Sequence, residues 1–437
     1  MLKNSTPSDR MNSKPWSILI AGMKAATIAL SLAAGAVGLT SSAQAHGERN
    51  QEPFLRMRTL HWYDLKWSAS KLKVNDELVV TGRVRAFEDW PNNLPHPMSV
   101  FLSTAGPGSV MARKESYVNE MPALQSFGMQ NGREYEFKLV LQARYPGRYH
   151  IHPTLLVNGA GPLAGPGSWV EVSGSVDDFV YPLKTLTGEV IPNLATYGMG
   201  TVLAWQGLWG VIAAFWMLWW LRRPLLMPRH LALLRGREDL LITRSDMILG
   251  GVIAVGTIVL VYGGAHWAEK KYPMTLPLQG GKAIIDPLPE AARAVNVKVV
   301  RAVYDVPGRS MRMTLDIKNN SDKVLTVGEF TTANLRFVNK TNPAAMAAVS
   351  PDYPTDIVPK TGLTVEGDKP LAPGETTRVT LDATDAIWEL ERLSSLITDP
   401  DNRFGGLLFL YDDQGNRHIS PVYGAIVPHF TDANTHF

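Results

Sequence analysis

The sequence predicts a mainly β protein that is interrupted by a membrane α-hairpin. Segments with alternating apolar residues and frequent turn signals occupy the regions before about Val190 and after about Ala294, and this pattern is typical of β-sandwich domains. Between them, residues 198–221 and 247–265 are uncharged and long enough to cross a bilayer as helices. A length of 437 residues suits two domains and one further element.

The composition excludes several kinds of partner and site. A net charge of +3 is small for this length and predicts no nucleic-acid partner. The chain has no cysteine, which excludes disulfides, thiolate zinc sites and blue-copper centres. Any exported domain must therefore be stabilised by its hydrophobic core.

The first 45 residues have the features of a cleaved secretory signal. Basic residues precede an apolar run over 25–39, which is shorter than a bilayer span. Ala43 and Ala45 provide the small side chains that a signal peptidase requires, so we expect His46 to begin the mature protein. The alternative is that this segment remains as a membrane anchor.

Three histidines form the candidate metal site. As the first residue, His46 would offer both an α-amine and an imidazole to one metal ion. His150 and His152 have the i, i+2 spacing that places two rings on one face of a strand, with Ile151 directed into the core. An all-nitrogen donor set favours copper. The alternatives are a chance cleavage motif and an ordinary polar strand face.

The N-terminal periplasmic domain, predicted over 46–190, shows β patterning throughout. Residues 132–141 alternate apolar with mostly charged side chains, and Pro146-Gly147 turns the chain into the strand that carries the histidines. Residues 159–167 contain so much Gly and Pro that we expect a rigid loop there.

The membrane hairpin is predicted within 191–271. Tryptophans lie near the ends of the two apolar runs, where amphipathic rings prefer the membrane interface. An arginine-rich loop over 222–244 joins the runs, and such loops stay cytoplasmic. Both flanking domains should then be periplasmic, in agreement with the export signal. The alternative is a pair of buried helices in a soluble core.

The C-terminal domain, predicted over 272–437, repeats the β pattern. We expect strands over 297–304, 311–317 and 405–411, and a turn followed by a strand over 371–381. Residues 385–396 have the pattern of a helix.

A set of motifs spread along the chain resembles the B subunit of the copper membrane monooxygenases, the particulate methane and ammonia monooxygenases. It includes Pro-Gly-Arg-Tyr-His-Ile-His and Gly-Pro-Leu-Ala-Gly-Pro-Gly-Ser-Trp. The segments that carry the resemblance are residues 46–59, 61–65, 146–152, 161–169, 186–189, 327–333, 399–408 and 415–417.

The resemblance implies two cupredoxin-like β-sandwich domains joined by two transmembrane helices. It also implies partner subunits A and C in a trimer of heterotrimers, placed in a bacterial inner or intracytoplasmic membrane. The reaction would be oxidation of methane to methanol, of ammonia to hydroxylamine, or of a short alkane by O2. The copper bound here would be either the reaction centre or a relay to a site in the C partner.

The copper ligands implied by the resemblance are His46, His150 and His152, with Glu48 as an acidic residue beside the site. Some family members have a further copper site, and the resemblance places His61 in it. Its second histidine is replaced here by Arg85, and an arginine has no lone pair to offer a metal. We therefore expect His61 to form a hydrogen bond within its domain instead. The other histidines are expected to be structural or exposed: His96, His230, His266, His418, His429 and His436.

Two other functions remain open from the sequence. One is a membrane-anchored periplasmic copper-binding or copper-delivery protein without turnover, and the other is a structural scaffold. Neither explains why the resemblance extends through segments that have no part in copper binding.

Overall fold

The computed structural model describes residues 53–105, 109–185, 188–222, 226–273, 281–290, 292–305, 310–349, 358, 361–367, 369–384 and 401–429. Several predicted features lie outside these residues: the signal over 1–45, His46, Glu48 and the helix over 385–396. They stay predictions.

The N-terminal β domain consists of two sheets that follow a short helix, α2 (Pro53–Arg58). Its core takes side chains from both sheets, among them Leu139 from the first and Ile151 from the second, with exposed fractions of 0% and 2%. The predicted alternation over 132–141 is confirmed, because Tyr135, Phe137 and Leu141 are also buried. The first sheet has the order β1 (Leu60–Trp67), β3 (Glu77–Ala86), β8 (Glu134–Ala143), β5 (Met111–Val118) and β6 (Met121–Pro122); the second has the order β14 (Lys282–Ala283), β7 (Ser126–Phe127), β4 (Val100–Ala105), β9 (Gly147–Val157), β11 (Ser168–Ser173) and β2 (Lys71–Lys73).

The segment predicted as a rigid loop over 159–167 contains a strand, so that prediction is wrong in part. Strand β10 (Gly161–Ala164) pairs antiparallel with β9, with Gly161 opposite Val157 and Ala164 opposite Thr154. The Gly and Pro content of this segment disfavours a strand. The strand can form because β10 is an edge strand, which pairs with β9 alone among the described strands. Such an edge position tolerates a proline, which has no N–H to donate to a ladder.

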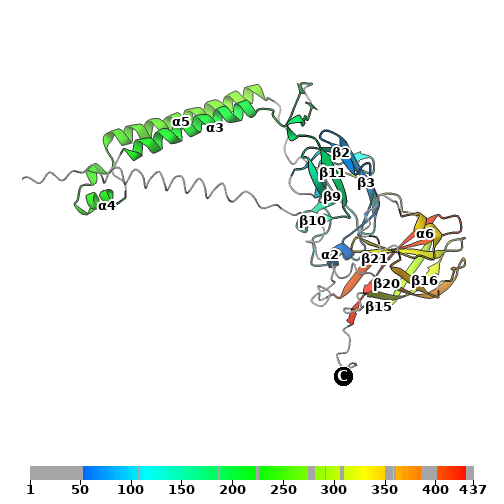
Figure 1. The fold of residues 1–437 in the computed structure, drawn as a ribbon. Coiled ribbons are helices and arrows are strands. Elements are labelled where there is room, and N and C mark those ends of the chain that lie inside the picture. Colours follow the sequence, from blue (N-terminus) through cyan, green and yellow to red (C-terminus); the bar gives the residue numbers. More distant parts are fainter. Residues whose placement is uncertain are drawn as a thin grey trace, which may run out of the picture. The chain divides into compact units, whose positions relative to one another are not determined.

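The membrane hairpin is formed by α3 (Met199–Leu221) and α5 (Arg244–Lys271), with α4 (Met227–Leu234) and the 3-10 helix η2 (Glu238–Leu240) between them (Figure 1). Both long helices have the length and composition of membrane spans. Asp246 is the one buried residue in the described parts of the two helices. Its carboxylate accepts hydrogen bonds from the Thr243 backbone N–H and from Trp219 Nε1, at 2.7 and 2.8 Å. The exposed surfaces do not support two core helices of a soluble protein.

The C-terminal β domain also has two sheets. The first has the order β19 (Leu363–Glu366), β20 (Thr376–Thr384), β16 (Ser310–Asn319), β15 (Val295–Asp305) and β23 (Val427–His429); the second has the order β18 (Leu335–Val338), β17 (Thr326–Thr332), β21 (Arg403–Tyr411) and β22 (Arg417–Ala425). The remaining elements are η1 (Val176–Asp178), β12 (Leu183–Lys184) and β13 (Val190–Ile191) before the hairpin, and α6 (Pro343–Ala347) after β18. The predicted fold class, two β domains with a helical hairpin, is confirmed.

The two β domains share a close interface built around α2, which packs against β21 (Figure 1). Met57 of α2 is completely buried, and Arg58 donates a hydrogen bond to Asp401 at 3.1 Å. Arg417 binds Asp64 through both guanidinium NH2 groups, at 2.7 and 2.5 Å. Gly405 lies so near this interface that a Cβ placed on it would be 2.5 Å from the Met57 carbonyl oxygen.

We predict that Gly405→Ala weakens the interface. The added methyl group would collide with Phe87 and with the Met57 carbonyl, and overpacking of this kind destabilises a protein by about 1–3 kcal/mol. The control is Gly128→Ala, whose Cβ would have an ordinary contact of 3.4 Å with the Met98 oxygen. Thermal unfolding of the full chain should show a lower midpoint for Gly405→Ala alone. Equal midpoints in the two variants would contradict this prediction.

Candidate metal centre

Strand β9 places His150 and His152 on one face. Their ring centroids are 4.4 Å apart and their planes are nearly perpendicular, at 85°. Ile151 between them is 2% exposed and belongs to the core. This is the arrangement that the i, i+2 spacing predicts, because successive side chains of a strand point to opposite faces.

The imidazole of His152 is oriented by a backbone group. Its Nδ1 lies 2.9 Å from the carbonyl oxygen of Gly165, and the ring is 1% exposed. A carbonyl oxygen can only accept, so Nδ1 must carry the proton and donate it. The lone pair of the neutral ring is then on Nε2, the atom that can coordinate a metal. Metal-binding histidines commonly have such a hydrogen bond on their other nitrogen.

Two glycines in the segment after β10 allow this close approach. A Cβ on Gly167 would lie 2.5 Å from Cε1 of His152, and a Cβ on Gly165 would lie 2.7 Å from the Trp62 ring. Both distances are shorter than any side chain could tolerate. In the sequence these glycines indicate only a loop, whereas their physical role is to let backbone pack directly on two rings.

Trp169 of β11 is a residue of this site that the sequence motifs did not single out as functional. It pairs with His150 across the sheet, and the two ring centroids are 4.9 Å apart at an angle of 33°. The Arg148 guanidinium also lies over the Trp169 ring, 4.4 Å from its centroid. Trp169 is 41% exposed while its neighbour Val170 is buried. The sequence signal that could have identified Trp169 is a large aromatic residue on the polar face of an alternating strand.

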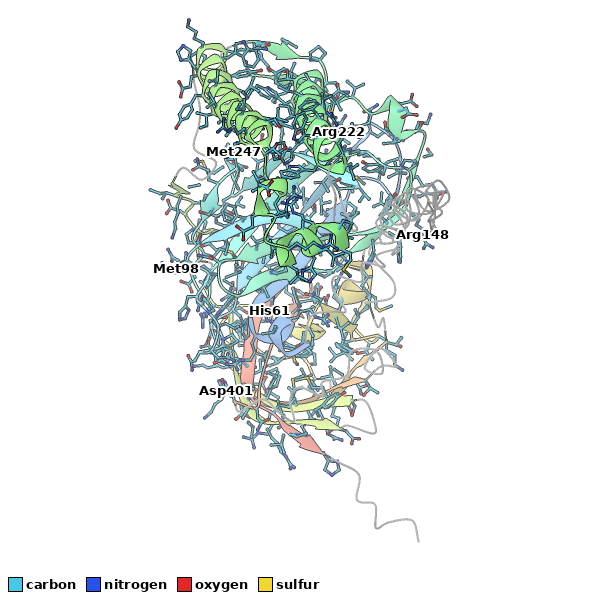
Figure 2. The ribbon with its side chains drawn as sticks, turned by 90° about the vertical axis from the view of Figure 1, so that its left-hand side faces the viewer. His61, Met98, Arg148, Arg222, Met247 and Asp401 are labelled. Atoms are coloured by element: carbon cyan, nitrogen blue, oxygen red, sulfur yellow. The ribbon has the colours of Figure 1, made fainter. Side chains whose placement is uncertain are left out.

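His61 is buried in the N-terminal β domain. It lies well apart from Arg148, whose guanidinium covers Trp169 (Figure 2). Its Nε2 donates a hydrogen bond to the Met57 carbonyl at 2.8 Å, the role expected for it. Burial lowers the pKa of His61 to about 3; the Met57 hydrogen bond partly opposes this, and the positive charge of Arg85 lowers it further. His61 is therefore a neutral core residue at physiological pH.

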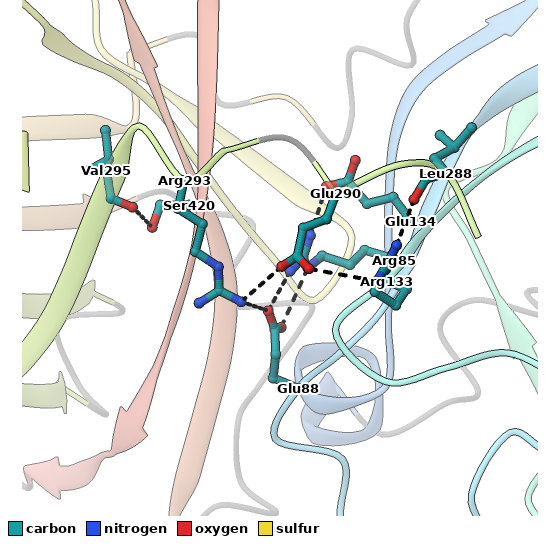
Figure 3. A network of polar contacts seen from close by, with 9 residues as sticks. All are labelled: Arg85, Glu88, Arg133, Glu134, Leu288, Glu290, Arg293, Val295 and Ser420. Atoms are coloured by element: carbon teal, nitrogen blue, oxygen red, sulfur yellow. Dashed lines mark hydrogen bonds and ion pairs between the residues drawn. The ribbon is translucent and has the colours of Figure 1, made fainter. Parts of the chain in front are cut away.

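Arg85 is directly opposite His61 in the register of β1 and β3. Its guanidinium forms ion pairs with Glu88 and Glu134, at 2.5 and 2.8 Å (Figure 3). Burial alone would lower the pKa of Arg85, but these two carboxylates raise it overall. A permanently charged donor therefore occupies the position where a second histidine would be needed for a metal site.

Glu88 also connects Arg85 to the chain segment that follows the membrane hairpin, through its contact with Arg293 (Figure 3). Arg293 is 3.7 Å from Glu88, and Arg133 is 3.6 Å from Glu290 and donates to the Leu288 carbonyl at 3.0 Å. This cluster is an ion-pair network rather than a ligand set.

Within the part of the chain that the structure describes, no three His, Asp or Glu side chains gather as a complete metal site. His150 and His152 supply two nitrogen donors, and the predicted third and fourth donors belong to His46, which is outside the described residues. Two imidazoles, one of them fixed with its lone pair on Nε2, fit copper better than magnesium or calcium, which prefer oxygen ligands.

We predict that His61 makes stability depend on pH. The unfolded chain binds a proton at His61 near pH 6.5 and the folded chain only near pH 3. The free energy of unfolding should therefore fall as the pH drops through this window, by about 1.4 kcal/mol per pH unit. His61→Gln retains a donor for the Met57 carbonyl and removes the titration. Urea unfolding at pH 6.5 and pH 5 should show a loss in the parent that exceeds the variant's by roughly 2 kcal/mol; equal losses would refute the assignment.

Comparisons with known proteins identify the family of this chain. A family model for the monooxygenase B-subunit protein matches residues 47–430. The particulate methane monooxygenase alpha subunit of Methylococcus capsulatus (strain Bath) is 41% identical over 402 residues, which cover 92% of this chain and 96% of that protein.

Likeness to solved structures is weaker. The cupredoxin domain of amoB from Nitrosocaldus yellowstonii is 22% identical, with a TM-score of 0.23, and the match covers 28% of this chain and 91% of that domain. The adhesin InvE of Yersinia pseudotuberculosis is 10% identical, with a TM-score of 0.17, covering 84% of this chain and 60% of that one. Neither score is high enough to carry an argument. The family match over residues 47–430 and the 41% identity along most of the chain show that this protein belongs to the family of monooxygenase B-subunit proteins.

Proposed function

We propose that this chain is the copper-binding subunit of a membrane-bound monooxygenase complex that oxidises methane or ammonia with O2. The observation that carries the proposal is the pair of histidines on β9, with His152 held by the Gly165 carbonyl so that its Nε2 lone pair can bind a metal. The name of the Methylococcus relative, a particulate methane monooxygenase subunit, supports the reaction class.

The proposed copper site consists of the α-amine and imidazole of His46 together with the imidazoles of His150 and His152, with Glu48 as the proposed acidic residue beside it. Bound copper would supply the redox chemistry with O2 that side chains lack. The chain's own residues hold the ligands: the Gly165 carbonyl fixes the tautomer of His152, and Trp169 covers a face of His150.

The same proposal includes the membrane and the partners. The apolar helices α3 and α5 support insertion in a lipid bilayer. The arginine-rich loop between them supports a cytoplasmic position for that loop and a periplasmic position for both β domains. Partner subunits A and C would complete the enzyme.

The reaction is tested with membranes that contain the intact complex. Oxygen-dependent formation of methanol from methane, or of hydroxylamine from ammonia, identifies the substrate. His152→Ala should abolish copper binding at this site. Copper binding by the parent without turnover of either substrate would instead indicate a copper-delivery protein.

We predict that copper binding requires cleavage after Ala45. Before cleavage the nitrogen of His46 is a planar amide and a poor donor, whereas the free amine has a pKa of about 8 and binds metal after losing a proton. An alanine inserted between Ala45 and His46 should leave a mature chain that begins Ala-His and binds copper much more weakly. Affinity in the parent should also decrease as the pH falls.

The measurement uses the full chain, with its N-terminus verified by mass spectrometry and copper affinity determined by competition with a chelator. His61→Ala serves as a control that should leave the copper content unaltered, because Arg85 prevents a second site there. Equal affinities in the parent and the insertion variant would show that the amine is not a ligand.

We predict that both β domains face the periplasm. A protease added to spheroplasts should cleave in the β domains and spare the loop over 222–244, as identified by mass spectrometry of the fragments. Cleavage within that loop in intact spheroplasts would contradict this topology, and lysed spheroplasts provide the positive control for loop cleavage.

A further inference from the structure

A two-residue turn of the C-terminal β domain lies against the N-terminal β domain. Ala333 and Asn334 join β17 to β18 and have φ angles of 49° and 69°. Positive φ at both central positions is required for the type I′ hairpin turn. Asn adopts this conformation readily, but Ala rarely does. A strained residue persists where its surroundings demand that conformation, so the turn is a candidate for a specific role.

Both residues of the turn make buried hydrogen bonds to the other domain. Asn334 Nδ2 donates to the carbonyl oxygen of Ala164 at 3.0 Å, and the Ala333 carbonyl accepts from Arg56 of α2, also at 3.0 Å. Asn334 and Ala164 are 9% and 3% exposed. A buried amide without such a partner would be destabilising by about 1–3 kcal/mol, so the contact is specific rather than incidental.

The carbonyl that Asn334 holds is next to the one that orients His152. Ala164 ends β10, and the following residue, Gly165, accepts the hydrogen bond from His152 Nδ1 at 2.9 Å. The Gly165 backbone N–H donates to the Pro153 carbonyl at 2.8 Å, so Gly165 is hydrogen-bonded to two consecutive residues of β9. Gly165 also packs directly on the Trp62 ring.

We propose that Asn334 is a positioning residue for His152. By holding the Ala164 carbonyl, it keeps the Gly165 carbonyl in line with Nδ1 and so fixes the ring and its tautomer. The C-terminal β domain, whose described residues contribute no ligand to the site, would thereby set the geometry of a copper ligand in the other domain. This inference rests on the proposed function, in which His152 binds copper.

The test variant is Asn334→Gly in the full chain. It removes the donor, while glycine adopts a φ of 69° without strain. The matched control is Asn342→Gly, another buried asparagine of the same domain, which caps α6 and donates to Thr326 Oγ1 at 2.9 Å. None of the hydrogen bonds described for Asn342 involves a residue of β10. Glycine is tolerated at a helix N-cap at a loss of only a few tenths of a kcal/mol.

Two readouts separate the contact from its consequence for copper. In copper-free protein, hydrogen exchange of the backbone amides in residues 161–168 should be faster in Asn334→Gly than in the parent or in Asn342→Gly. In copper-loaded protein, Asn334→Gly should lower copper affinity by about 10- to 100-fold, the range found when groups that orient metal ligands are removed. The Cu(II) electron paramagnetic resonance spectrum should change with it.

Unchanged exchange and unchanged copper affinity in Asn334→Gly would overturn the proposal. Equal losses in Asn342→Gly would also overturn it, because they would reflect general destabilisation of the domain. If Asn334→Gly does not fold, Asn334→Asp retains the size of the side chain and removes the N–H donor, and the same outcomes apply. Full copper affinity in His152→Ala would refute the proposed copper site, whereas the exchange readout would still decide whether Asn334 holds β10.

Discussion

Helix α2 buries two arginines between the β domains, and much of the structure depends on how their charges are satisfied. Arg56 and Arg58 are each 2% exposed. A buried guanidinium is strongly unfavourable unless hydrogen bonds replace its water. The C-terminal β domain supplies the Ala333 carbonyl for Arg56 and the Asp401 carboxylate for Arg58, and Asp89 of the N-terminal β domain also pairs with Arg58. The two domains therefore cannot separate without exposing or stranding these charges, and their relative position is defined by directional contacts as well as by apolar packing.

The orientation of His152 in the candidate copper site depends on contacts at that interface. His152 takes its orientation from a backbone carbonyl, and that backbone is held by side chains on both sides: Trp62 through the close approach of Gly165, and Asn334 through Ala164. A carbonyl is a good orienting group because it can only accept, which leaves one tautomer of the histidine. The energetic advantage would be preorganisation, since little side-chain freedom would remain to be lost on binding of the proposed metal.

The region around His61 is organised by the charge of Arg85. With Arg85 opposite His61, carboxylates gather around the guanidinium, and the network extends through Glu88 to Arg293 (Figure 3). The histidine itself becomes a buried neutral donor, with a pKa lowered to about 3 by burial first and by the charge of Arg85 in addition. The ion pairs of Glu88 with Arg85 and Arg293 form an electrostatic connection between the N-terminal β domain and the segment after the hairpin.

The class of the fold and the pairing of the two strand histidines could be predicted from the sequence, because both depend on short-range periodicity. Uncharged runs of sufficient length form α3 and α5, alternation forms β8, and an i, i+2 spacing on a strand brings His150 and His152 together. Composition also excluded thiolate chemistry.

The features that depend on partners distant in the chain follow only from the tertiary structure. Strand β10 forms despite its Gly and Pro because β9 offers it a ladder, and β14 joins the N-terminal sheet from beyond the hairpin. Asn334 meets Ala164 across 170 positions of sequence. Such contacts follow from strand register and domain packing, which local patterns do not specify. The backbone edge of a strand can pair with many different sequences, and the packing of the assembled core determines which segment pairs with it.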